Sequence, residues 1–210
     1  KDTKLTPRIA GTAKALFAVY LSLSILCGGA YYAAGMSGFD ALCHALSTVA
    51  IGGFSTHDAS MGYFASNAIL LICSLFMLIS GISFGMHYIA WSRRNFGAYR
   101  SDSETRFYLS AIAVCTVITC GFLLASETLD SQDSLVHGLF QTISIVTTAG
   151  FATQDFGAWP LFLPIMLIMF SFMGGCVGST AGGIKAMRLM LIYKQGLREM
   201  KQLVPPHAVI

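Results

Sequence analysis

Four long apolar stretches constrain the fold of this 210-residue chain more than any other feature. A helix rises about 1.5 Å per residue, so about 20 apolar residues cross the hydrocarbon core of a bilayer. Stretches of about that length or more occupy residues 15–35, 65–91, 107–125 and 161–183. Two shorter apolar pieces occupy residues 39–51 and 135–149. The sequence therefore predicts an all-α polytopic membrane protein with four spans and two short re-entrant helices.

The composition excludes a soluble protein. Hydrophobic residues make up 55% of the chain and charged residues 11%, against roughly 25% charged residues in an ordinary globular domain. A globule of this size has too little interior to bury so much apolar surface. We therefore expect neither a soluble enzyme, nor a disordered chain, nor a nucleic-acid partner. The six cysteines include no Cys-x-x-Cys pair and lie mostly in apolar stretches, as buried hydrophobic residues do.

The basic residues indicate how the chain is oriented. All thirteen Lys and Arg residues fall within residues 1–14, 93–106 and 185–201. The two loops that contain the short apolar pieces hold acidic residues and no Lys or Arg. Because cytoplasmic loops carry an excess of Lys and Arg, both termini of the chain and its middle loop are predicted to be cytoplasmic. Both short pieces then enter the membrane from the outside.

The chain contains an internal repeat. A shift of 97 residues places Ser47 on Ser144 and Gly53 on Gly150, and further on it places Gly81 on Gly178. Fixed-period self-similarity is the signature of a repeated structural unit. We therefore divide the chain into a first helix–pore-helix–helix repeat, residues 1–97, and a second, residues 98–210. The second carries a glycine-rich segment, residues 174–183, and a cytoplasmic tail.

The backbone that follows each short helix is predicted to line a polar path. A re-entrant helix of about a dozen residues ends near the middle of the membrane, and its carboxyl end carries partial negative charge. Non-helical backbone at that depth is tolerated where it lines a cavity or is buried in protein. Residues 50–54 and 147–151 should therefore direct carbonyl groups towards a cation. The alternative is that both segments are plain turns of the outer loops.

The glycine-rich segment is predicted to interrupt the last span. It contains five glycines in ten residues, whereas the matching residues 77–86 contain two. Each glycine costs about 1 kcal/mol in a helix interior relative to alanine, so the helix should break at mid-membrane. Ser179 and Thr180 are able to satisfy the freed backbone groups. The alternative is close helix packing through small residues.

Two further functions remain open from the residues. The run Gly81-Ile82-Ser83-Phe84-Gly85, with His87 close behind, matches the Gly-x-Ser-x-Gly nucleophile pattern and suggests an intramembrane serine protease. It lies within an apolar stretch that we expect to be one continuous span, where packing glycines are the ordinary explanation. A membrane subunit without transport is the other alternative. We expect no buried acid on a span, which favours a channel-like path over proton coupling.

Three segments resemble the superfamily of Trk, Ktr and plant HKT potassium transporters, and most closely its bacterial Trk members. They are residues 47–60 (STVAIGGFSTHDAS), 144–151 (SIVTTAGF) and 174–185 (GGCVGSTAGGIK). The resemblance covers nearly the whole chain. It implies a pore with four repeats about a pseudo-fourfold axis, of which this chain resembles the second and third. We therefore expect either a fragment of a longer subunit or a pore completed by two copies.

The resemblance implies potassium as the transported substrate, no enzymatic activity and no organic cofactor. It implies that backbone carbonyls of two filter segments bind potassium: Ala50, Ile51, Gly52 and Gly53, and Thr147, Thr148, Ala149 and Gly150. It also implies an intramembrane gating loop formed by Gly174, Gly175, Gly178, Ser179, Thr180, Gly182 and Gly183, with Lys185 at its border to repel cations.

The resemblance also implies where the protein works and with what. The location is the bacterial inner membrane, in contact with membrane lipid. The partners are a second copy of the subunit, forming a homodimer, and a cytoplasmic ring of nucleotide-binding TrkA-type regulatory subunits. The basic surfaces at residues 93–106 and 185–201 suit docking of that ring, and anionic lipid headgroups would suit them equally well.

Overall fold

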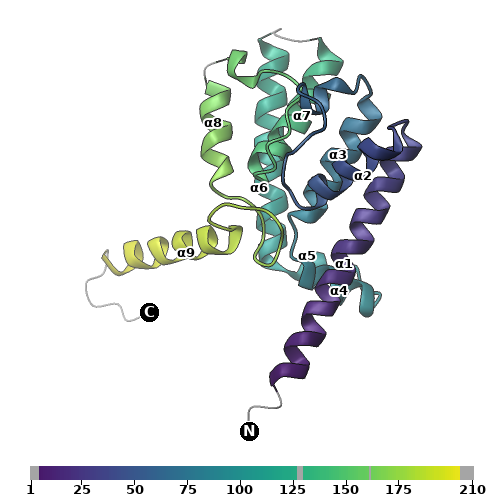
Figure 1. The fold of residues 1–210 in the computed structure, drawn as a ribbon. Coiled ribbons are helices and arrows are strands. Elements are labelled where there is room, and N and C mark those ends of the chain that lie inside the picture. The colour runs from purple at the N-terminus through teal and green to yellow at the C-terminus, as the bar shows by residue number, and fades with distance from the viewer. Residues whose placement is uncertain (1–4, 127–129, 161, 204–210) are drawn as a thin grey trace.

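The computed structural model describes residues 5–126, 130–160 and 162–203, and within these ranges every regular element is a helix (Figure 1). The first half comprises α1 (Leu5–Ala33), α2 (Gly38–Val49), the single turn η2 (Ser60–Tyr63), α3 (Asn67–Ser80) and α4 (Phe84–Ser92). The short helix α5 (Gly97–Ser101) leads to the second half, which comprises α6 (Ser103–Ala125), α7 (Ser131–Val146), η3 (Phe156–Ala158), α8 (Phe162–Ser171) and α9 (Ala186–Leu203). The first basic residues, Lys1 and Lys4, and the first residue of the predicted fourth span, Leu161, lie outside the described residues.

The two halves repeat the same order of elements. In each half a long helix packs against a short one, α1 against α2 and α6 against α7. A third, apolar helix follows, α3 in the first half and α8 in the second, and each leads into a break in the helical backbone. Helix α3 also packs against α7, which ties the first half to the second. The predicted repeat therefore has a counterpart in the arrangement of the helices.

Both predicted short helices are present. Helix α2 has 12 residues, and its first turn is capped by the Ser37 hydroxyl, which accepts a hydrogen bond from the Asp40 N–H at 3.1 Å. Helix α7 has 16 residues and begins after Asp130. At about 1.5 Å per residue neither helix would cross a hydrocarbon core of about 30 Å. Their lengths agree with a re-entrant position.

The described residues contain two helices that are long and apolar enough to cross a membrane, Ala10–Ala33 within α1 and Ser103–Ala125. The expectation of one continuous helix over residues 65–91 was wrong. Helices α3 and α4 meet at an angle of 91° across the break at residues 81–83. The physical reason is that Gly81 packs directly against Tyr108 of α6 and accepts a hydrogen bond from the glycine-rich segment.

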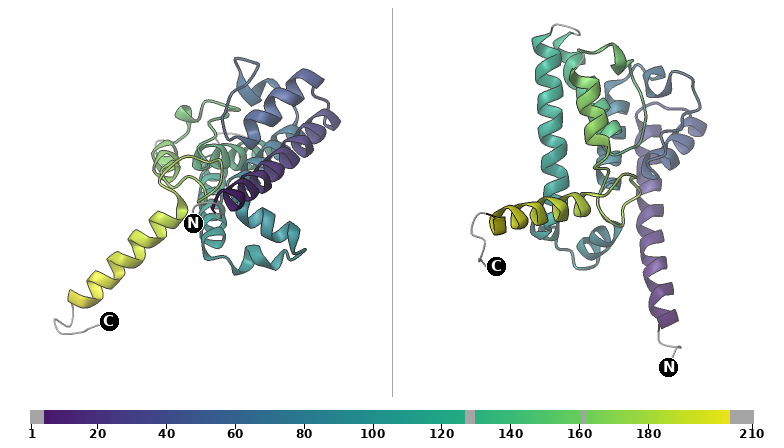
Figure 2. Two further views of the ribbon diagram at one scale, coloured as in Figure 1. Left: turned by 60° about the horizontal axis from the view of Figure 1, so that its bottom comes forward. Right: turned by 90° about the vertical axis from the view of Figure 1, so that its left-hand side faces the viewer.

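The predicted interruption of the last span is confirmed. Helix α8 ends at Ser171, and residues 172–185 form no helix before α9 begins at Ala186. Helix α9 then projects away from the bundle, in a direction different from that of α6 and α8 (Figure 2). Every residue from 191 to 201 is exposed. The second half therefore ends in a projecting helix rather than in a completed span.

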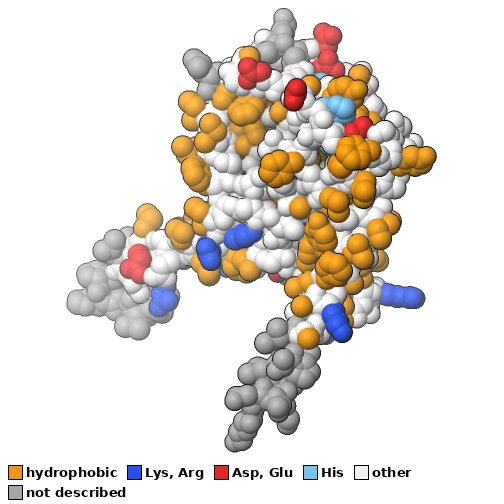
Figure 3. All heavy atoms as spheres, in the orientation of Figure 1, with side chains coloured by type: hydrophobic (Ala, Val, Ile, Leu, Met, Phe, Trp, Pro, Cys, Tyr) orange, Lys and Arg blue, Asp and Glu red, His pale blue; other side chains and the backbone are white. Residues whose placement is uncertain are grey.

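The surface is typical of a protein that lies in lipid. Figure 3 shows hydrophobic side chains over the flanks of the bundle, most acidic side chains at its upper end and basic ones at its lower end. Large apolar residues on α1, such as Phe17, Ile25 and Leu26, are more than half exposed. All six cysteines are free, and all but Cys43 are buried, as predicted. Apolar flanks with charge at the two ends are what a membrane protein requires.

Candidate ion path

The two predicted filter segments, residues 50–53 and 147–150, have the same backbone conformation. The residue after each short helix, Ala50 or Thr147, is right-handed. Left-handed residues then alternate with others: Ile51 and Gly53 have φ of 53° and 69°, and Thr148 and Gly150 have φ of 68° and 84°. Left-handed backbone is rare for residues other than glycine. The predicted filter requires successive carbonyl groups on one side of the chain, and we expect this alternation to provide it.

The same hydrogen bonds hold both filter segments to their short helices. The Gly52 N–H donates to the Ser47 carbonyl, and the Ala149 N–H donates to the Ser144 carbonyl, both at 2.8 Å. The serine hydroxyls bind the residues that follow: Ser47 Oγ accepts from the Phe54 N–H at 2.8 Å, and Ser144 Oγ donates to the Phe151 carbonyl at 2.7 Å. The N–H groups of Gly52 and Ala149 are thus bound within their own halves. Among the described residues, no group donates a hydrogen bond to the carbonyls of 51–53 or 148–150.

The two filter segments lie against each other. A Cβ atom added to Gly53 would lie 2.0 Å from the Ala149 carbonyl oxygen and 3.1 Å from the Gly150 carbonyl carbon. Glycine is therefore required at position 53 by the neighbouring segment as well as by its positive φ. Around Gly150 the corresponding space is open, with nothing within 4 Å of an added Cβ. The first segment contacts the second through Gly53, whereas Gly150 faces open space.

A polar clamp holds the chain outside each filter segment to the first turns of its short helix. In the first half, the Asp40 carboxylate accepts a hydrogen bond from Thr56 Oγ1 at 2.6 Å, and His57 Nε2 lies 3.3 Å from it. At the equivalent positions of the second half, His137 Nδ1 lies 2.9 Å from Thr153 Oγ1. The Thr56 hydroxyl, followed by that of Ser37, lowers the pKa of Asp40. The 97-residue shift pairs Asp40 with His137 and Thr56 with Thr153. The sequence repeat could therefore have predicted this clamp, and sequence analysis missed it.

The predicted gating loop, residues 174–183, is folded tightly on itself. A Cβ added to Gly174, where φ is 65°, would lie 2.0 Å from the Gly182 carbonyl oxygen. Gly178 and Gly183 are also left-handed, with φ of 78° and 75°. The Ser179 hydroxyl closes a turn by donating to the Cys176 carbonyl at 2.7 Å. The glycines are therefore needed for this fold of the loop, and helix packing does not explain them.

The glycine-rich loop contacts the ends of both short helices. Thr180 Oγ1 donates to the Val49 carbonyl, in the last residue of α2, at 2.8 Å. The Gly182 N–H donates to Thr148 Oγ1 at 2.8 Å, within the second filter segment. The Lys185 ammonium group donates to the Ala181 carbonyl. The structure thus brings the predicted loop and both predicted filter segments into one site.

The loop also docks on the break between α3 and α4. The Cys176 N–H donates to the Gly81 carbonyl at 2.8 Å, and the Phe84 N–H donates to the Gly178 carbonyl at 2.9 Å. Gly81 and Gly178 are equivalent in the repeat. The interruptions of the two halves therefore bind each other, and backbone groups freed by one interruption are satisfied by the other.

The Gly-x-Ser-x-Gly run has a structural use at this break. Ser83 is the residue before α4 begins. The His87 ring is bound elsewhere, with Nδ1 2.8 Å from the Tyr99 hydroxyl and Nε2 2.9 Å from the Ile79 carbonyl. Both ring nitrogens therefore have partners other than Ser83, whereas a catalytic serine needs its histidine within hydrogen-bond reach.

The expectation that no acid would be buried on a span was wrong for Glu104. This residue lies in the first turn of α6 and is 6% exposed. Its Oε1 accepts hydrogen bonds from the Val177 N–H at 2.7 Å and from the Met187 N–H at 3.2 Å. Sequence analysis missed it because the apolar stretch begins at residue 107. Among the described residues, no group of three or more His, Cys, Asp and Glu residues is able to hold a metal ion.

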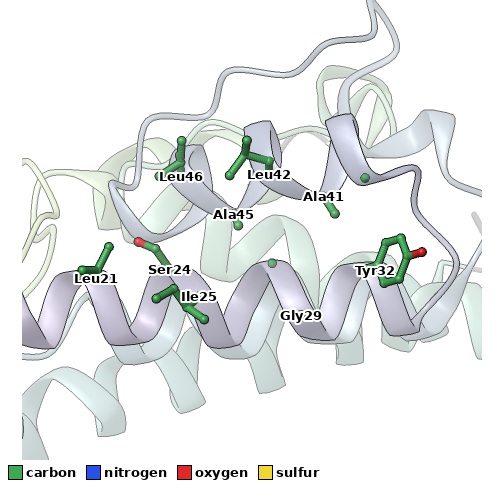
Figure 4. A pocket seen from close by; sticks show the side chains of 11 residues that line it. Leu21, Ser24, Ile25, Gly29, Tyr32, Ala41, Leu42, Ala45 and Leu46 are labelled. Carbon is green, nitrogen blue, oxygen red and sulfur yellow. The ribbon is translucent and has the colours of Figure 1, made fainter.

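A separate groove lies between α1 and α2 (Figure 4). Its lining is almost entirely apolar, with Leu21, Ile25, Leu42 and Leu46 around small residues. The Ser24 hydroxyl in this groove already donates a hydrogen bond to the Tyr20 carbonyl at 2.9 Å. The groove thus offers little to a cation, and its lining includes no residue of the two predicted filter segments.

Comparison with known proteins decides the family. The profile of the TrkH family, described as cation transport protein, matches residues 1–210. The chain belongs to the TrkH family. It is 52% identical over 210 residues to the Trk system potassium uptake protein TrkH of Halomonas elongata, and 45% identical over 213 residues to TrkH of Escherichia coli K12. All of this chain is covered in both comparisons, but it spans about 44% of each relative's length.

A solved TrkH structure has the same fold. The crystal structure of the potassium transporter TrkH from Vibrio parahaemolyticus is 49% identical in sequence and superposes with a TM-score of 0.95. The superposition covers 99% of this chain and 45% of that one. The chain is therefore an all-α polytopic membrane protein of the TrkH family, equivalent to less than half of such a transporter.

Proposed function

We propose that the full-length protein containing this chain takes up potassium across the bacterial inner membrane, through a path lined by the carbonyls of residues 50–53 and 147–150. One observation carries the proposal. Two adjacent segments have the same alternating left-handed backbone, and their carbonyl oxygens receive no hydrogen bond from the described residues. The names of the relatives, Trk system potassium uptake proteins, support the same substrate.

Carbonyl oxygens suit a monovalent cation. Removing water from an ion is very costly, and rings of carbonyl oxygens replace the lost hydration, as in potassium-channel filters. The carboxyl ends of α2 and α7 add partial negative charge at the same place. In the superfamily that this sequence resembles, glycine at the filter position of each repeat goes with potassium permeation, and Gly53 and Gly150 both have it. The path uses backbone and hydroxyl groups, so it calls for no organic cofactor.

In this proposal residues 1–97 and 98–210 are two of the repeats around the pore, and the glycine-rich loop is its gate. The loop is hydrogen-bonded to the last residue of α2, to Thr148 of the second filter segment and to the break between α3 and α4. Its glycines give it the freedom to move, and its contacts hold it across the path. Lys185, which binds the Ala181 carbonyl, brings a positive charge to the loop that opposes cation passage.

The proposed orientation and partners follow from the charge pattern and from the family. Both ends of this chain face the cytoplasm, where basic residues gather at residues 93–106 and 185–201. The protein forms a homodimer and binds a TrkA-type nucleotide-binding regulatory subunit through these surfaces. The naming of the relatives as parts of a Trk system supports an assembly of more than one component.

The test is potassium-limited growth of uptake-deficient cells that express the full-length protein, with its regulatory subunit supplied. A parallel strain carries Gly150→Asp. Nothing lies within 4 Å of an added Cβ at Gly150, and aspartate tolerates positive φ better than most residues, so the fold should survive. We expect rescue by the parent and at least a tenfold loss of uptake in the variant. Failure of a well-expressed parent to rescue growth would overturn the proposal, and equal rescue by both would remove Gly150 from the path.

A further inference from the structure

Glu104 is a buried carboxylate that the proposed path does not use. It is 6% exposed, in the first turn of α6. Burying a charged group is costly unless it is paired or hydrogen-bonded, so such a residue usually has a specific task. Its partners are two backbone N–H groups, of Val177 and Met187, which lie 73 and 83 residues further along the chain.

The two donors flank residues 178–186, which comprise the second part of the glycine-rich loop and the start of α9. Val177 belongs to the loop itself, and Met187 is the second residue of α9. The first N–H groups of a helix have no partner within the helix, so the carboxylate caps α9 and favourably faces its positive end. One carboxylate oxygen therefore joins the loop to the start of the projecting helix.

Glu104 is not needed to cap the first turn of α6, because Asp102 is the N-cap of that helix. The Asp102 carboxylate accepts hydrogen bonds from the Thr105 N–H at 2.8 Å and from Thr105 Oγ1 at 2.6 Å. Glu104 contacts neither of these groups. Glu104 instead binds backbone N–H groups of the glycine-rich loop and of α9, so its hydrogen bonds reach beyond α6.

We propose that Glu104 is a positioning residue that latches the glycine-rich loop to α9, so that a displacement of α9 releases the loop. The proposal rests on the proposed function of the loop as a gate. Helix α9 is suited to receive such a displacement, because it projects from the bundle and contacts α6 near Glu104 (Figure 1). A partner that binds the exposed face of α9 would then act on the loop through a single carboxylate.

The test uses the full-length protein in membranes and compares Glu104→Ala, Glu104→Gln and the control Asp133→Ala, which removes an acidic side chain from the first turn of α7. The first readout is the rate at which a water-soluble thiol reagent modifies Cys176, measured by mass spectrometry. Cys176 lies in the loop and is fully buried, as is Cys115 on α6. The second readout is the rate of potassium flux per mole of inserted protein.

We expect Glu104→Ala to raise the rate of Cys176 modification and the flux about tenfold, an effect that hydrogen bonds to a charged group are strong enough to produce. Glu104→Gln keeps an acceptor oxygen and should give a smaller rise. Asp133→Ala should match the parent at Cys176. The rate at Cys115 should stay unchanged in all variants, because general loosening of the protein would expose it too.

Parent-like rates at Cys176 in both Glu104 variants would overturn the latch, and so would an equal rise at Cys115. If the Glu104→Ala protein is not inserted into the membrane, the rates of Cys176 and Cys115 modification in Glu104→Gln decide instead. The modification rate does not depend on transport. A faster rate at Cys176 in a protein that carries no potassium would therefore keep the latch and reject the proposed function.

Discussion

Thr148 combines two roles in this structure. Its backbone is left-handed within the second filter segment, and its hydroxyl accepts the Gly182 N–H of the glycine-rich loop. The equivalent residue of the first segment, Ile51, has the same backbone conformation and no hydroxyl. The loop is therefore attached to one filter segment by a side chain that the other segment lacks.

Replacing Thr148 by valine should loosen the loop and leave the filter backbone as it is. Valine keeps the shape and the β-branch of threonine and removes one hydrogen bond. That bond is worth about 1 kcal/mol, so the ratio of released to attached loop should rise about fivefold. We expect potassium flux through the full-length protein to rise by about that factor, with the preference for potassium over sodium retained.

The adjacent Thr147 provides the control. Its hydroxyl donates to the Ile143 carbonyl within α7, at 2.7 Å. Thr147→Val therefore removes a hydroxyl next to Thr148 without touching the loop. Fluxes that do not differ between the two variants would contradict a role of Thr148 in holding the gate.

Sequence analysis reached the residues of the site unevenly. The 97-residue repeat and the spacing of glycines predicted non-helical backbone at residues 50–53, 147–150 and 174–183, and the structure has it there. Glu104 was missed, since its partners lie more than 70 residues away and are backbone groups. No local pattern indicates that a carboxylate will be buried against distant backbone N–H groups.

At the scale of helices, the interruption at residues 172–185 is easier to predict from the sequence than the one at residues 81–83. Five glycines in residues 174–183 predict a break, whereas residues 77–86 contain two and read as a continuous helix. The break at 81–83 is stabilised from outside by Tyr108 and by the loop, through Cys176 and Gly178. Tertiary contacts decide there, and helix propensity is a weak guide.

Gly81→Ala should destabilise this junction. Its Cβ would lie 2.0 Å from the Tyr108 hydroxyl oxygen and 2.7 Å from the attached ring carbon. Because the Tyr108 hydroxyl is bound to the Leu78 carbonyl at 3.1 Å, it has little room to move away. We expect a loss of about 1–3 kcal/mol, typical of overpacking, visible as a lower melting temperature of the purified protein.

Gly85→Ala serves as the matched control, four residues further on. An added Cβ there would meet Ser83 Oγ at 3.6 Å, an ordinary contact, within helix α4. Alanine is favoured over glycine by about 1 kcal/mol in a helix, so this variant should be neutral or more stable. Equal melting temperatures of the two variants would argue that Tyr108 does not enforce the break.

For the whole molecule, the family and the all-helical membrane-protein class agree with what the sequence predicts. Apolar length, charge distribution and repeat all act over long windows, which makes them robust. The number of complete spans was harder to predict from the sequence, because bends and breaks in the helices depend on contacts between the two halves. The two segments 50–53 and 147–150 contact each other at Gly53, and Gly150 faces open space.

The most direct test of the account is to locate the ion. Crystals of the full-length protein grown with rubidium in place of potassium would show its position by anomalous scattering. We expect a peak bounded by the carbonyl oxygens of both residues 50–53 and residues 147–150. Occupied ion sites elsewhere on the protein, with none at these two segments in the same fold, would contradict the central claim that these backbones bind the transported cation.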